Sequence, residues 1–321
     1  MLKFRAFVLF FSLGLFLPAT RAAASPSDLL AAGRVDEAIA SLQAQLKSSP
    51  SNASYYNDLC RAYFSVEDWD RAISSCEKAV SLDSSNSDYY LWLGRSYGEK
   101  AERANPLSAM SLARKLRKAF ETAVELNPSN VDARVDLAEF YMEAPGVVGG
   151  GQDKARAQAA ALANIAPSKS HYVYGRLAER NKDLPSAEKE YRAAIEAGSN
   201  HASDWLNLAL FYKHQNRLDD MEQALRRAVT AHSGQNEVLV ESADLLVRTG
   251  RSASAAAQLV RRYLSSSSPS ERSPLFEAHY VLGTALEKQG DTQGAAKEYR
   301  AALSLASNFS AAKEALNRVS R

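Results

Sequence analysis

The chain has 321 residues, a formal net charge of +2 and two cysteines, and 46% of its residues are hydrophobic. This near-neutral charge gives no electrostatic reason to expect binding to nucleic acid or to an anionic membrane surface. A chain of this length would ordinarily form about two domains, but internal repeats change that expectation.

The first 24 residues have the pattern of a secretory signal peptide. Lys3 and Arg5 form a positively charged start, an apolar run follows, and Ala22-Ala23-Ala24 offers a cleavage site after Ala22 or Ala24. The alternative is an uncleaved membrane anchor, but the run is too short to cross about 30 Å of hydrocarbon comfortably as a helix. We therefore interpret residues 1–24 as a cleaved signal.

This interpretation predicts an exported mature chain, 25–321, in a periplasmic or extracellular space. Loss of Lys3, Arg5 and Arg21 changes the formal net charge from +2 to −1. No second apolar run is long enough to span a membrane, so we expect no membrane span in the mature chain.

Residues 53–86 predict two antiparallel helices. Apolar residues in the first half recur at the spacing of one helix face, namely Tyr56, Leu59, Cys60 and Tyr63. The second half repeats this pattern with Ala72, Ile73, Cys76, Ala79 and Val80. The segment between them is short and polar, so the helices must fold back as a hairpin.

This unit of 34 residues recurs along the chain and resembles the tetratricopeptide repeat (TPR). The motifs that carry the resemblance are Tyr90-x-x-Leu93-Gly94-x-x-Tyr97, Trp205-x-x-Leu208-Ala209-x-x-Tyr212 and Ala187-x-x-x-Tyr191. The resemblance implies an all-α solenoid, a right-handed superhelix of about eight hairpins. The repeats are expected at 25–52, 53–86, 87–130, 131–167, 168–201, 202–235, 236–269 and 276–309. We expect residues 310–321 to form a C-terminal capping helix over the last repeat, and the truncated first repeat to occupy the other capping position.

Three segments depart from the repeat length. Residues 98–115 contain an insertion that Asn105-Pro106 should break, and 145–151 form a glycine-rich loop. This loop has the spacing of a phosphate-binding loop, but Gln152-Asp153 stand where that motif needs Lys-Ser/Thr, so we interpret it as a turn. Residues 265–274 are rich in serine and predict a flexible polar link.

No arrangement of residues indicates catalysis. The five histidines do not pair with each other or with other ligands at a metal-binding spacing, and no Gly-x-Ser-x-Gly elbow occurs. We therefore expect no catalytic residue, no metal and no cofactor. The function that the resemblance implies is a non-enzymatic scaffold of the bacterial envelope or secreted space, which holds a partner protein or peptide in its concave groove.

Two alternatives stay open. A chaperone-like or assembly factor would bind many exported chains weakly, whereas a scaffold binds one partner specifically. An enzyme, or the regulatory part of one, would need a site built by the insertions of repeats 3 and 4.

The resemblance also assigns a partner-binding groove, because the first helix of each repeat lines the concave face of TPR proteins. The residues at these positions are Asn57, Arg61, Trp92, Arg95, Asp132, Asp136, Glu139, Glu143, Arg176 and Arg180. Four of them, Asp132 to Glu143, form an acidic stripe on one helix face. The stripe predicts a partner with a basic or mixed-charge segment, and Trp92 is expected as an aromatic anchor. Asp132 and Asp136 stand where the family's carboxylate clamp has Lys and Arg, so a C-terminal carboxylate should be repelled.

Cys60 and Cys76 are predicted to form a disulfide. They face inward from the two helices of one repeat, at slots that the resemblance brings together near the helix crossing. Export to an oxidising space favours such a pair.

Overall fold

The computed structural model describes residues 24–231, 236–266 and 269–320. The expected signal peptide therefore lies outside the described residues, apart from Ala24. Within the described ranges the regular structure consists of 17 α-helices and one short 3-10 helix. None of these helices is long and apolar enough to cross a membrane.

The helices follow one another as hairpins. Their bounds are α1 Pro26–Ala31, α2 Val35–Ser48, α3 Ala53–Ser65, α4 Trp69–Leu82, α5 Ser87–Glu102, α6 Pro106–Leu126, α7 Val131–Glu143, η1 Gly146–Val148, α8 Gln152–Leu162, α9 Pro167–Arg180, α10 Leu184–Ala197, α11 Ala202–His214, α12 Leu218–Ala231, α13 Glu237–Arg248, α14 Ala253–Leu264, α15 Leu275–Lys288, α16 Thr292–Leu305 and α17 Ser310–Val319. Each odd-numbered helix from α1 to α15 packs against the even-numbered helix that follows it.

Small residues let the two helices of a hairpin approach closely. A Cβ atom placed on Gly94 of α5 would lie 2.4 Å from the Phe120 ring of α6, and one on Gly283 of α15 would lie 2.6 Å from the Tyr299 ring of α16. A side chain at either glycine would force the helices apart. The glycines of the repeat motif therefore fix the geometry of these hairpins.

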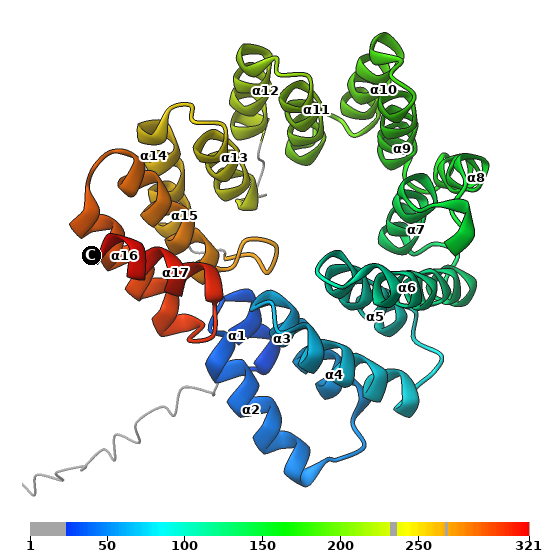
Figure 1. The fold of residues 1–321 in the computed structure, drawn as a ribbon, viewed down its shortest axis with the longest axis horizontal. Helices are drawn as coiled ribbons and strands as arrows, with labels where there is room; N and C mark the ends of the chain where they lie inside the picture. Colours follow the sequence, from blue (N-terminus) through cyan, green and yellow to red (C-terminus); the bar gives the residue numbers. More distant parts are fainter. Residues whose placement is uncertain (1–23, 232–235, 267–268, 321) are drawn as a thin grey trace, which may run out of the picture.

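The hairpins are arranged in a closed ring (Figure 1). The first helices of successive hairpins, α1, α3, α5 and onward to α15, contact one another and form a continuous wall. In the described ranges, the second helices from α4 to α14 contact no neighbouring second helix. This asymmetry curves the array toward the first helices, which we call the inner wall.

The ring closes because the two ends of the chain share a hydrophobic cluster. Leu29 and Leu30 of α1 and Val35 of α2 are buried together with Phe276 of α15 and Phe309, which precedes α17. The helices α2 and α16 are in contact. This closure buries the apolar faces that the ends of an open solenoid would expose.

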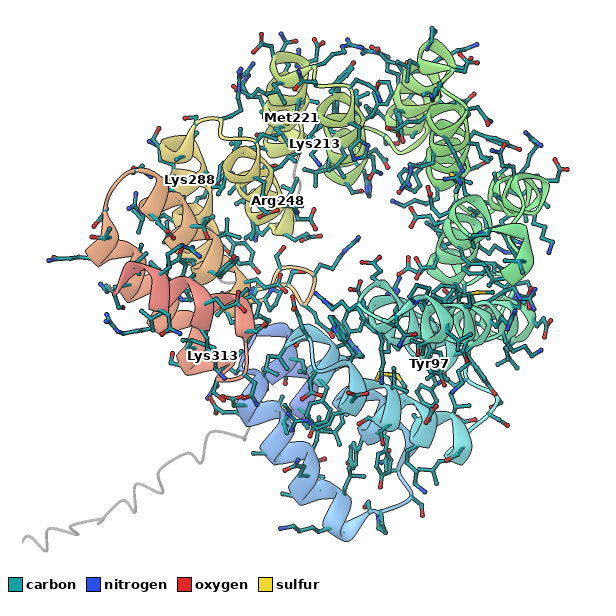
Figure 2. All side chains as sticks on the ribbon, viewed as in Figure 1. Tyr97, Lys213, Met221, Arg248, Lys288 and Lys313 are labelled. Carbon is teal, nitrogen blue, oxygen red and sulfur yellow. A yellow bond between two sulfur atoms is a disulfide. The ribbon has the colours of Figure 1, made fainter. Side chains whose placement is uncertain are left out.

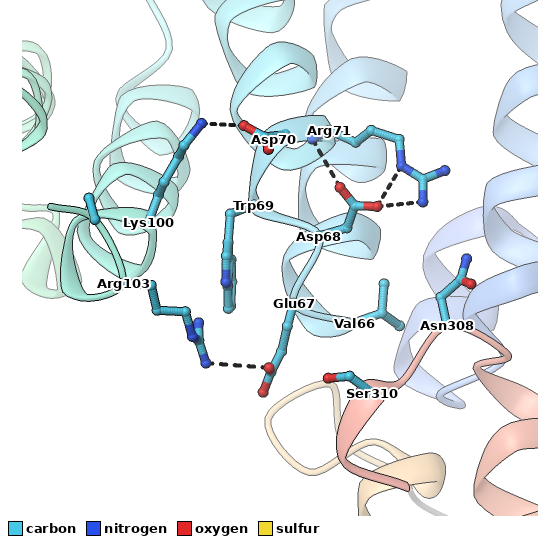
Figure 3. A pocket seen from close by; sticks show the side chains of 11 residues that line it. Val66, Glu67, Asp68, Trp69, Asp70, Arg71, Lys100, Arg103, Asn308 and Ser310 are labelled. Carbon is cyan, nitrogen blue, oxygen red and sulfur yellow. Dashed lines mark hydrogen bonds and ion pairs between the residues drawn. The ribbon is translucent and has the colours of Figure 1, made fainter. Parts of the chain in front are cut away.

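Polar groups also join the two ends. The backbone N–H of Ser307 donates to Asp36 Oδ2 at 2.9 Å. The turn between α3 and α4 and the turn before α17 line one pocket of about 500 Å³, with Glu67 and Asn308 on its walls (Figure 3). Arg103 donates to Glu67 at 3.3 Å in the same pocket.

The closed ring changes the expected role of the chain ends. α17 packs on α15 and α16, and its residues Ala312 and Ala315 are buried. Ala312, however, belongs to the same cluster as Leu29, so the start of α17 lies at a junction with the first repeat and not on a free end. The sequence pattern predicted two separate caps, and it did not anticipate that they would meet.

The serine-rich link, which the sequence predicts to be flexible, forms a hydrogen-bonded turn in its described part. Ser270 and Ser273 form an isolated antiparallel bridge. The hydroxyl of the buried Tyr263 donates to the Ser273 carbonyl and accepts from the Ser270 N–H. The helix that follows begins at Leu275 after Pro274. We call residues 270–273 the linker turn.

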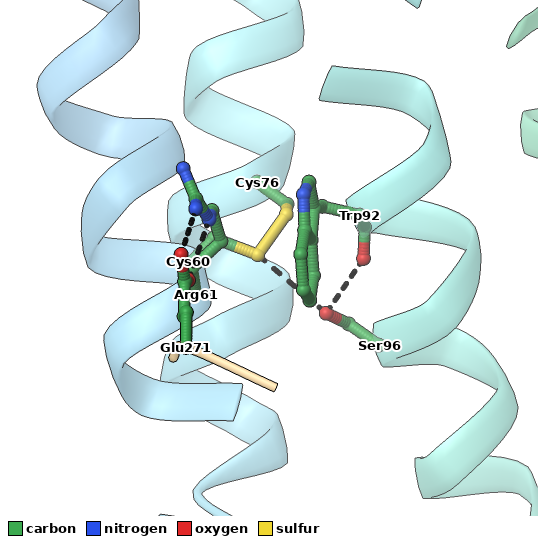
Figure 4. Close-up of a disulfide and its surroundings, with 6 residues drawn as sticks. All are labelled: Cys60, Arg61, Cys76, Trp92, Ser96 and Glu271. Atoms are coloured by element: carbon green, nitrogen blue, oxygen red, sulfur yellow. Dashed lines mark hydrogen bonds and ion pairs between the residues drawn. A yellow bond between two sulfur atoms is a disulfide. The ribbon is translucent and has the colours of Figure 1, made fainter. Parts of the chain in front are cut away.

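The structure contains the predicted disulfide between Cys60 of α3 and Cys76 of α4 (Figure 4). Their Cα atoms are 5.2 Å apart, which is within the range a disulfide needs. Both residues are fully buried. Cys60 Sγ also lies 3.5 Å from the hydroxyl oxygen of Ser96 on α5, so the bond sits where the second and third hairpins meet.

Candidate functional site

The inner wall presents charged and aromatic side chains toward the centre of the ring (Figure 2). Lys213 of α11 and Arg248 of α13 are among them and line one cleft there. The residues that the sequence assigned to a groove lie on the helices of this wall, at α3, α5, α7 and α9. Their partners within the chain, however, were not anticipated.

Arg61 of α3 is bound by a carboxylate from the linker turn. Its Nε donates to Glu271 Oε1 at 2.9 Å, and its Nη2 pairs with the second oxygen (Figure 4). A bidentate contact of this kind is the strong form of an arginine–carboxylate pair. The linker turn therefore bridges from the C-terminal part of the ring to the second hairpin, across 210 residues of sequence.

Trp92 of α5 is covered by its neighbours. The guanidinium carbons of Arg61 and Arg95 lie 5.5 Å and 5.0 Å from the centre of its ring. Phe64 contacts the same ring edge-on, with the ring centres 5.4 Å apart. Trp92 is half-buried and packs against the cluster that contains the disulfide. It serves as part of the wall, with a limited surface left for a partner.

The acidic stripe on α7 is matched by arginines of the adjacent inner helices. Arg95 of α5 donates to Asp136 at 2.6 Å and reaches Asp132 at 3.5 Å. Arg176 of α9 donates to Glu139 and Glu143, both at 3.2 Å. Glu143 also pairs with Arg180.

These ion pairs correct the predicted electrostatics of the groove. The sequence interpretation treated the stripe as free negative charge, but three arginines compensate it within the chain. Asp132 is the most accessible of its carboxylates, with 66% of the side chain exposed. A strongly basic partner is therefore not required by the stripe.

The structure also corrects the prediction that Asn57 belongs to the partner-binding groove. It is 7% exposed, and its side-chain oxygen has no hydrogen-bond partner among the described residues. A residue this buried is not available for direct contact with a partner. The helical position is at the inner wall, but the neighbouring structure covers the side chain.

Burial sets the ionisation of the stripe as strongly as charge does. Desolvation raises the pKa of Asp136 above its ordinary value, even though Arg95 opposes this. Burial likewise raises the pKa of Tyr172, whose hydroxyl donates to Glu139. The polar side chains between α5, α7 and α9 thus form one hydrogen-bonded network, which holds the inner helices together.

Two large clefts on the inner wall share Arg272 of the linker turn as a lining residue. The first, which we call the insertion cleft, has a volume of about 920 Å³ and lies between α5, α6, α7 and η1. Trp92, Met110, Phe140 and Val147 are among its lining residues. The insertion in residues 98–115 and the glycine-rich loop 145–151 both contribute lining residues, so these two insertions build the cleft.

The glycine-rich loop 145–151 folds tightly to form one side of the insertion cleft. A Cβ on Gly150 would lie 1.8 Å from the Ala144 carbonyl oxygen, and one on Gly149 would meet Arg117. Gly149 also adopts a left-handed conformation, with φ of 98°, which glycine accepts without strain. These constraints explain the glycines by backbone geometry, as the interpretation of a turn predicts.

The second, which we call the lumen cleft, has a volume of about 890 Å³ and lies between α9, α11, α13, α15 and the linker turn. Lys213, Glu241 and Glu277 line it, and in the described ranges their side chains make no ion pair or hydrogen bond with other side chains. Leu210 is 41% exposed at the same surface. The cleft thus combines unpaired charges of both signs with apolar surface.

Glu277 has the most altered ionisation in the lumen cleft. Burial, followed by the nearby negative charges of Asp244 and Glu241, raises its pKa to about 8. The pKa values of Asp244 and Glu241 are also raised, and burial is again the main cause. These carboxyl groups face one another from α13 and α15, so at neutral pH they favour a proton or a nearby cation.

Two histidines join the helices of their own hairpins through contacts with glutamates. His171 and His279 are half-buried, and their Nδ1 atoms lie 2.8 Å and 2.7 Å from carboxylate oxygens of Glu190 and Glu298. Each pair spans the two helices of its own hairpin and stabilises it. Among the described residues no group of three or more His, Cys, Asp or Glu side chains could hold a metal ion.

A family model described as tetratricopeptide repeat matches residues 27–88, 172–237 and 240–311, which together are more than half of the chain. The chain belongs to the tetratricopeptide repeat family. The unmatched segment between the first two ranges contains both insertions and most of the insertion cleft. TPR arrays create extended concave surfaces for contacts with other proteins, so the inner wall is the candidate interaction surface.

Solved structures of other TPR proteins are similar to this chain. A thermophilic TPR protein of Thermus thermophilus is 18% identical, with a TM-score of 0.49; the match covers 58% of this chain and 94% of that one. A TPR protein of Parabacteroides merdae is 17% identical, with a TM-score of 0.42 and coverage of 84% and 99%. YrrB, a TPR protein with an unusual peptide-binding site, is 19% identical, with a TM-score of 0.37 and coverage of 59% and 91%. No curated protein matches the chain.

Proposed function

We propose that this TPR protein is an exported, non-enzymatic scaffold that binds a partner polypeptide on the inner wall of its ring. The observation that carries the proposal is the pair of clefts on that wall, which offer apolar surface beside charges that the described chain leaves unpaired. A polypeptide has the mixed apolar and charged surface that such a wall can recognise.

The size of the clefts supports a peptide-sized occupant. Their volumes of about 920 and about 890 Å³ are at the upper end of the range for specific binding sites, about 300–1,000 Å³. Arg272 stands between them and makes no side-chain ion pair in the described part of the chain. A single partner segment that runs past the linker turn would contact both clefts.

Export is part of the proposal and rests on the sequence of residues 1–24. Cleavage after Ala24 would leave Ser25 as the first residue, and Ser25 caps α1 through a capping box with Asp28. Removal of the leader would therefore not disturb the first helix. N-terminal sequencing of the protein from fractionated cells tests this: a mature chain that begins at Ala23 or Ser25 supports export, and an intact Met1 in the cytoplasmic fraction contradicts it.

Affinity capture tests the scaffold. The mature chain is immobilised and exposed to an envelope extract, and a variant with Lys213→Glu and Leu210→Glu serves as the comparison. One partner at a fixed ratio, retained by the natural chain and lost by the variant, supports a scaffold that uses the inner wall. Many clients at low occupancy would favour the chaperone-like role, and capture that the variant leaves unchanged would remove the lumen cleft from the binding surface.

A further inference from the structure

The insertion cleft exposes an apolar helix face that serves no core. Within α6, the buried residues are Ala119, Phe120 and Ala123, all in its C-terminal half. The N-terminal half, from Pro106 to Lys118, contains no buried residue. Most of the stability of a helix in a protein comes from the packing of its apolar face, and burial within the ring does not account for the full length of α6.

The apolar side chains of this extension point in two directions. Leu112 and Leu116 pack against the hydrophobic clusters of the ring. Ala109, Met110 and Ala113, at the helical spacing of one face, belong to no such cluster and line the insertion cleft instead. These three residues are half-buried, and the part of their apolar surface that stays accessible faces the cleft.

The opposite wall of the cleft is also apolar. Phe140 of α7 lines it together with Val147 and Val148 of η1. Val147 is 67% exposed, although valine is among the residues most often buried. The tight fold of the glycine-rich loop thus presents a hydrophobic side chain to an open cleft.

Charge around the cleft selects between occupants. The lining includes five carboxylates and two arginines. Asp136, Glu139 and Glu143 are paired with arginines of α5 and α9. Among the described residues this leaves Arg272 of the linker turn without an ion pair, and it leaves Glu99 and Glu102 at the end of α5. Glu99 has only a distant contact with Arg103, at 3.9 Å, and Glu102 has no ion pair among the described residues.

We infer that the insertion cleft binds an apolar segment of a partner polypeptide that carries a lysine or arginine at the Glu99–Glu102 end. This inference rests on the proposed function and specifies the partner's chemistry. Apolar partner side chains fill the space between Met110 and Phe140, which removes both surfaces from water. A basic side chain then meets two carboxylates that the described chain leaves without full partners. At the Glu99–Glu102 end, an anionic lipid or fatty acid would bring its negative charge to the same carboxylates and is disfavoured there.

Two synthetic peptides test the inference by calorimetric titration into the full mature chain. Both have leucine at the same positions, and the remaining positions are lysine in one and glutamate in the other. We expect the lysine peptide to bind about tenfold more tightly or better. Met110→Gln should weaken it about tenfold, because the apolar surface is lost while volume and charge are kept.

Matched variants distinguish binding in the insertion cleft from nonspecific binding to exposed hydrophobic side chains. Leu107→Gln changes an 80% exposed leucine of the same helix that does not line the cleft, so it should bind the lysine peptide like the natural chain. Glu102→Lys should reduce the preference for lysine over glutamate. Equal binding of the two peptides, equal loss in Leu107→Gln and Met110→Gln, or tighter binding of oleate than of the lysine peptide would overturn the inference.

These experiments distinguish a failure of the cleft inference from a failure of the scaffold proposal. If the partner captured by the natural chain is captured equally by Met110→Gln, the scaffold stands and the cleft inference falls. If the capture experiment returns no partner but the lysine peptide still binds in a Met110-dependent way, the cleft is a binding site and the scaffold proposal falls.

Discussion

Phe309 packs edge-on against Phe276, with 5.0 Å between the ring centres and 74° between the ring planes. The first residue precedes α17 and the second lies on α15, and both are buried in the cluster that also contains Leu29 and Leu30 of the first helix. This contact lies at the centre of the ring closure, so its removal should open the ring.

Phe309→Ala is expected to lower the free energy of unfolding by about 3 kcal/mol, because a buried aromatic side chain is lost and a cavity remains. The radius of gyration from small-angle X-ray scattering should increase as the ends separate. Leu107→Ala removes an exposed side chain outside the closure cluster and should change neither quantity. An unchanged radius in a destabilised Phe309→Ala protein would mean that the polar contacts alone hold the ring closed.

Gly33 provides a second test of the closure. It has a φ of +66°, and a Cβ there would lie 2.5 Å from the backbone nitrogen of Leu275. Gly290 has a φ of +84° but open space around it. Gly290→Ala should cost about 1 kcal/mol from backbone strain alone, and Gly33→Ala should cost clearly more because backbone must also shift. If chemical denaturation shows the same loss of unfolding free energy in both variants, the backbone at Leu275 can shift without an energetic cost.

The disulfide should add to stability by restricting the unfolded chain. Cys60 and Cys76 are 16 residues apart, and closing a loop of that length contributes about 3 kcal/mol in the loop-entropy model. The protein, unfolded without reductant, should show no titratable thiol. Reduction should lower the denaturation midpoint, and Cys60→Ala with Cys76→Ala should match the reduced protein. Two free thiols in the unreduced chain would contradict the bond.

Reversing the charge of an inner-wall carboxylate tests its contribution to the stability of the fold, because these carboxylates form ion pairs within the chain. Asp136→Lys would place a second cation beside Arg95 in a half-buried position, and we expect a loss of about 2 kcal/mol. Asp132→Lys is the matched control, because that side chain is 66% exposed and lies 3.5 Å from the same arginine. It should change stability by less than about 0.5 kcal/mol. Circular dichroism during thermal unfolding measures both, and similar losses would argue against a structural role for the Arg95–Asp136 pair.

Glu277 should make stability fall as pH rises. Its pKa in the folded chain is about 8, above its value in the unfolded chain, so the folded state holds the proton more tightly. The resulting stabilisation is present below the unfolded pKa and is lost progressively up to about pH 8. Glu277→Gln should therefore lose less stability than the natural chain between about pH 5 and about pH 9.

Glu287 on the same helix supplies a control of opposite sign. Hydrogen bonds from Arg318 lower its pKa, so it stabilises the fold above its unfolded pKa and that contribution is lost as pH falls. Glu287→Gln should destabilise the protein at neutral pH and converge with the natural chain in acid. Parallel pH profiles for Glu277→Gln and the natural chain would show that the raised pKa has no effect on folding.

The hairpins could be predicted from the sequence because their signals are local. The helical period of apolar residues indicated the helices, and Asn105-Pro106 marked the break that the structure places between α5 and α6. The disulfide followed from two positions within one repeat. Each of these features depends on residues that are close along the chain.

The ring closure could not be predicted in this way. It depends on contacts such as that of Asp36 with Ser307, which are 271 residues apart, and it depends on the summed curvature of all the hairpins. The sequence contains only a weak signal of the closure. Phe309 and Leu29 are apolar residues near the two ends of the repeat array, where an open array would expose them to solvent.

The compensation of the acidic stripe has a signal in the sequence, namely the spacing of the opposite charges. Arg95 and Asp132 are 37 residues apart, and so are Arg176 and Glu139. A spacing of about one repeat places opposite charges on adjacent inner helices. A single helix face does not contain this information, because each ion pair joins the inner helices of two adjacent repeats.

The meeting of α1 with α15 and α17 also limits how this protein can evolve. An open array can gain or lose a copy of its repeat, since each copy depends only on its neighbours. Here the rotations of all the hairpins must add up to one full turn, so a duplicated or deleted unit would leave the two ends displaced and the cluster around Phe309 exposed. The number of units is therefore fixed by geometry, and change is confined to insertions within units, which is where the chain has acquired its additional cleft.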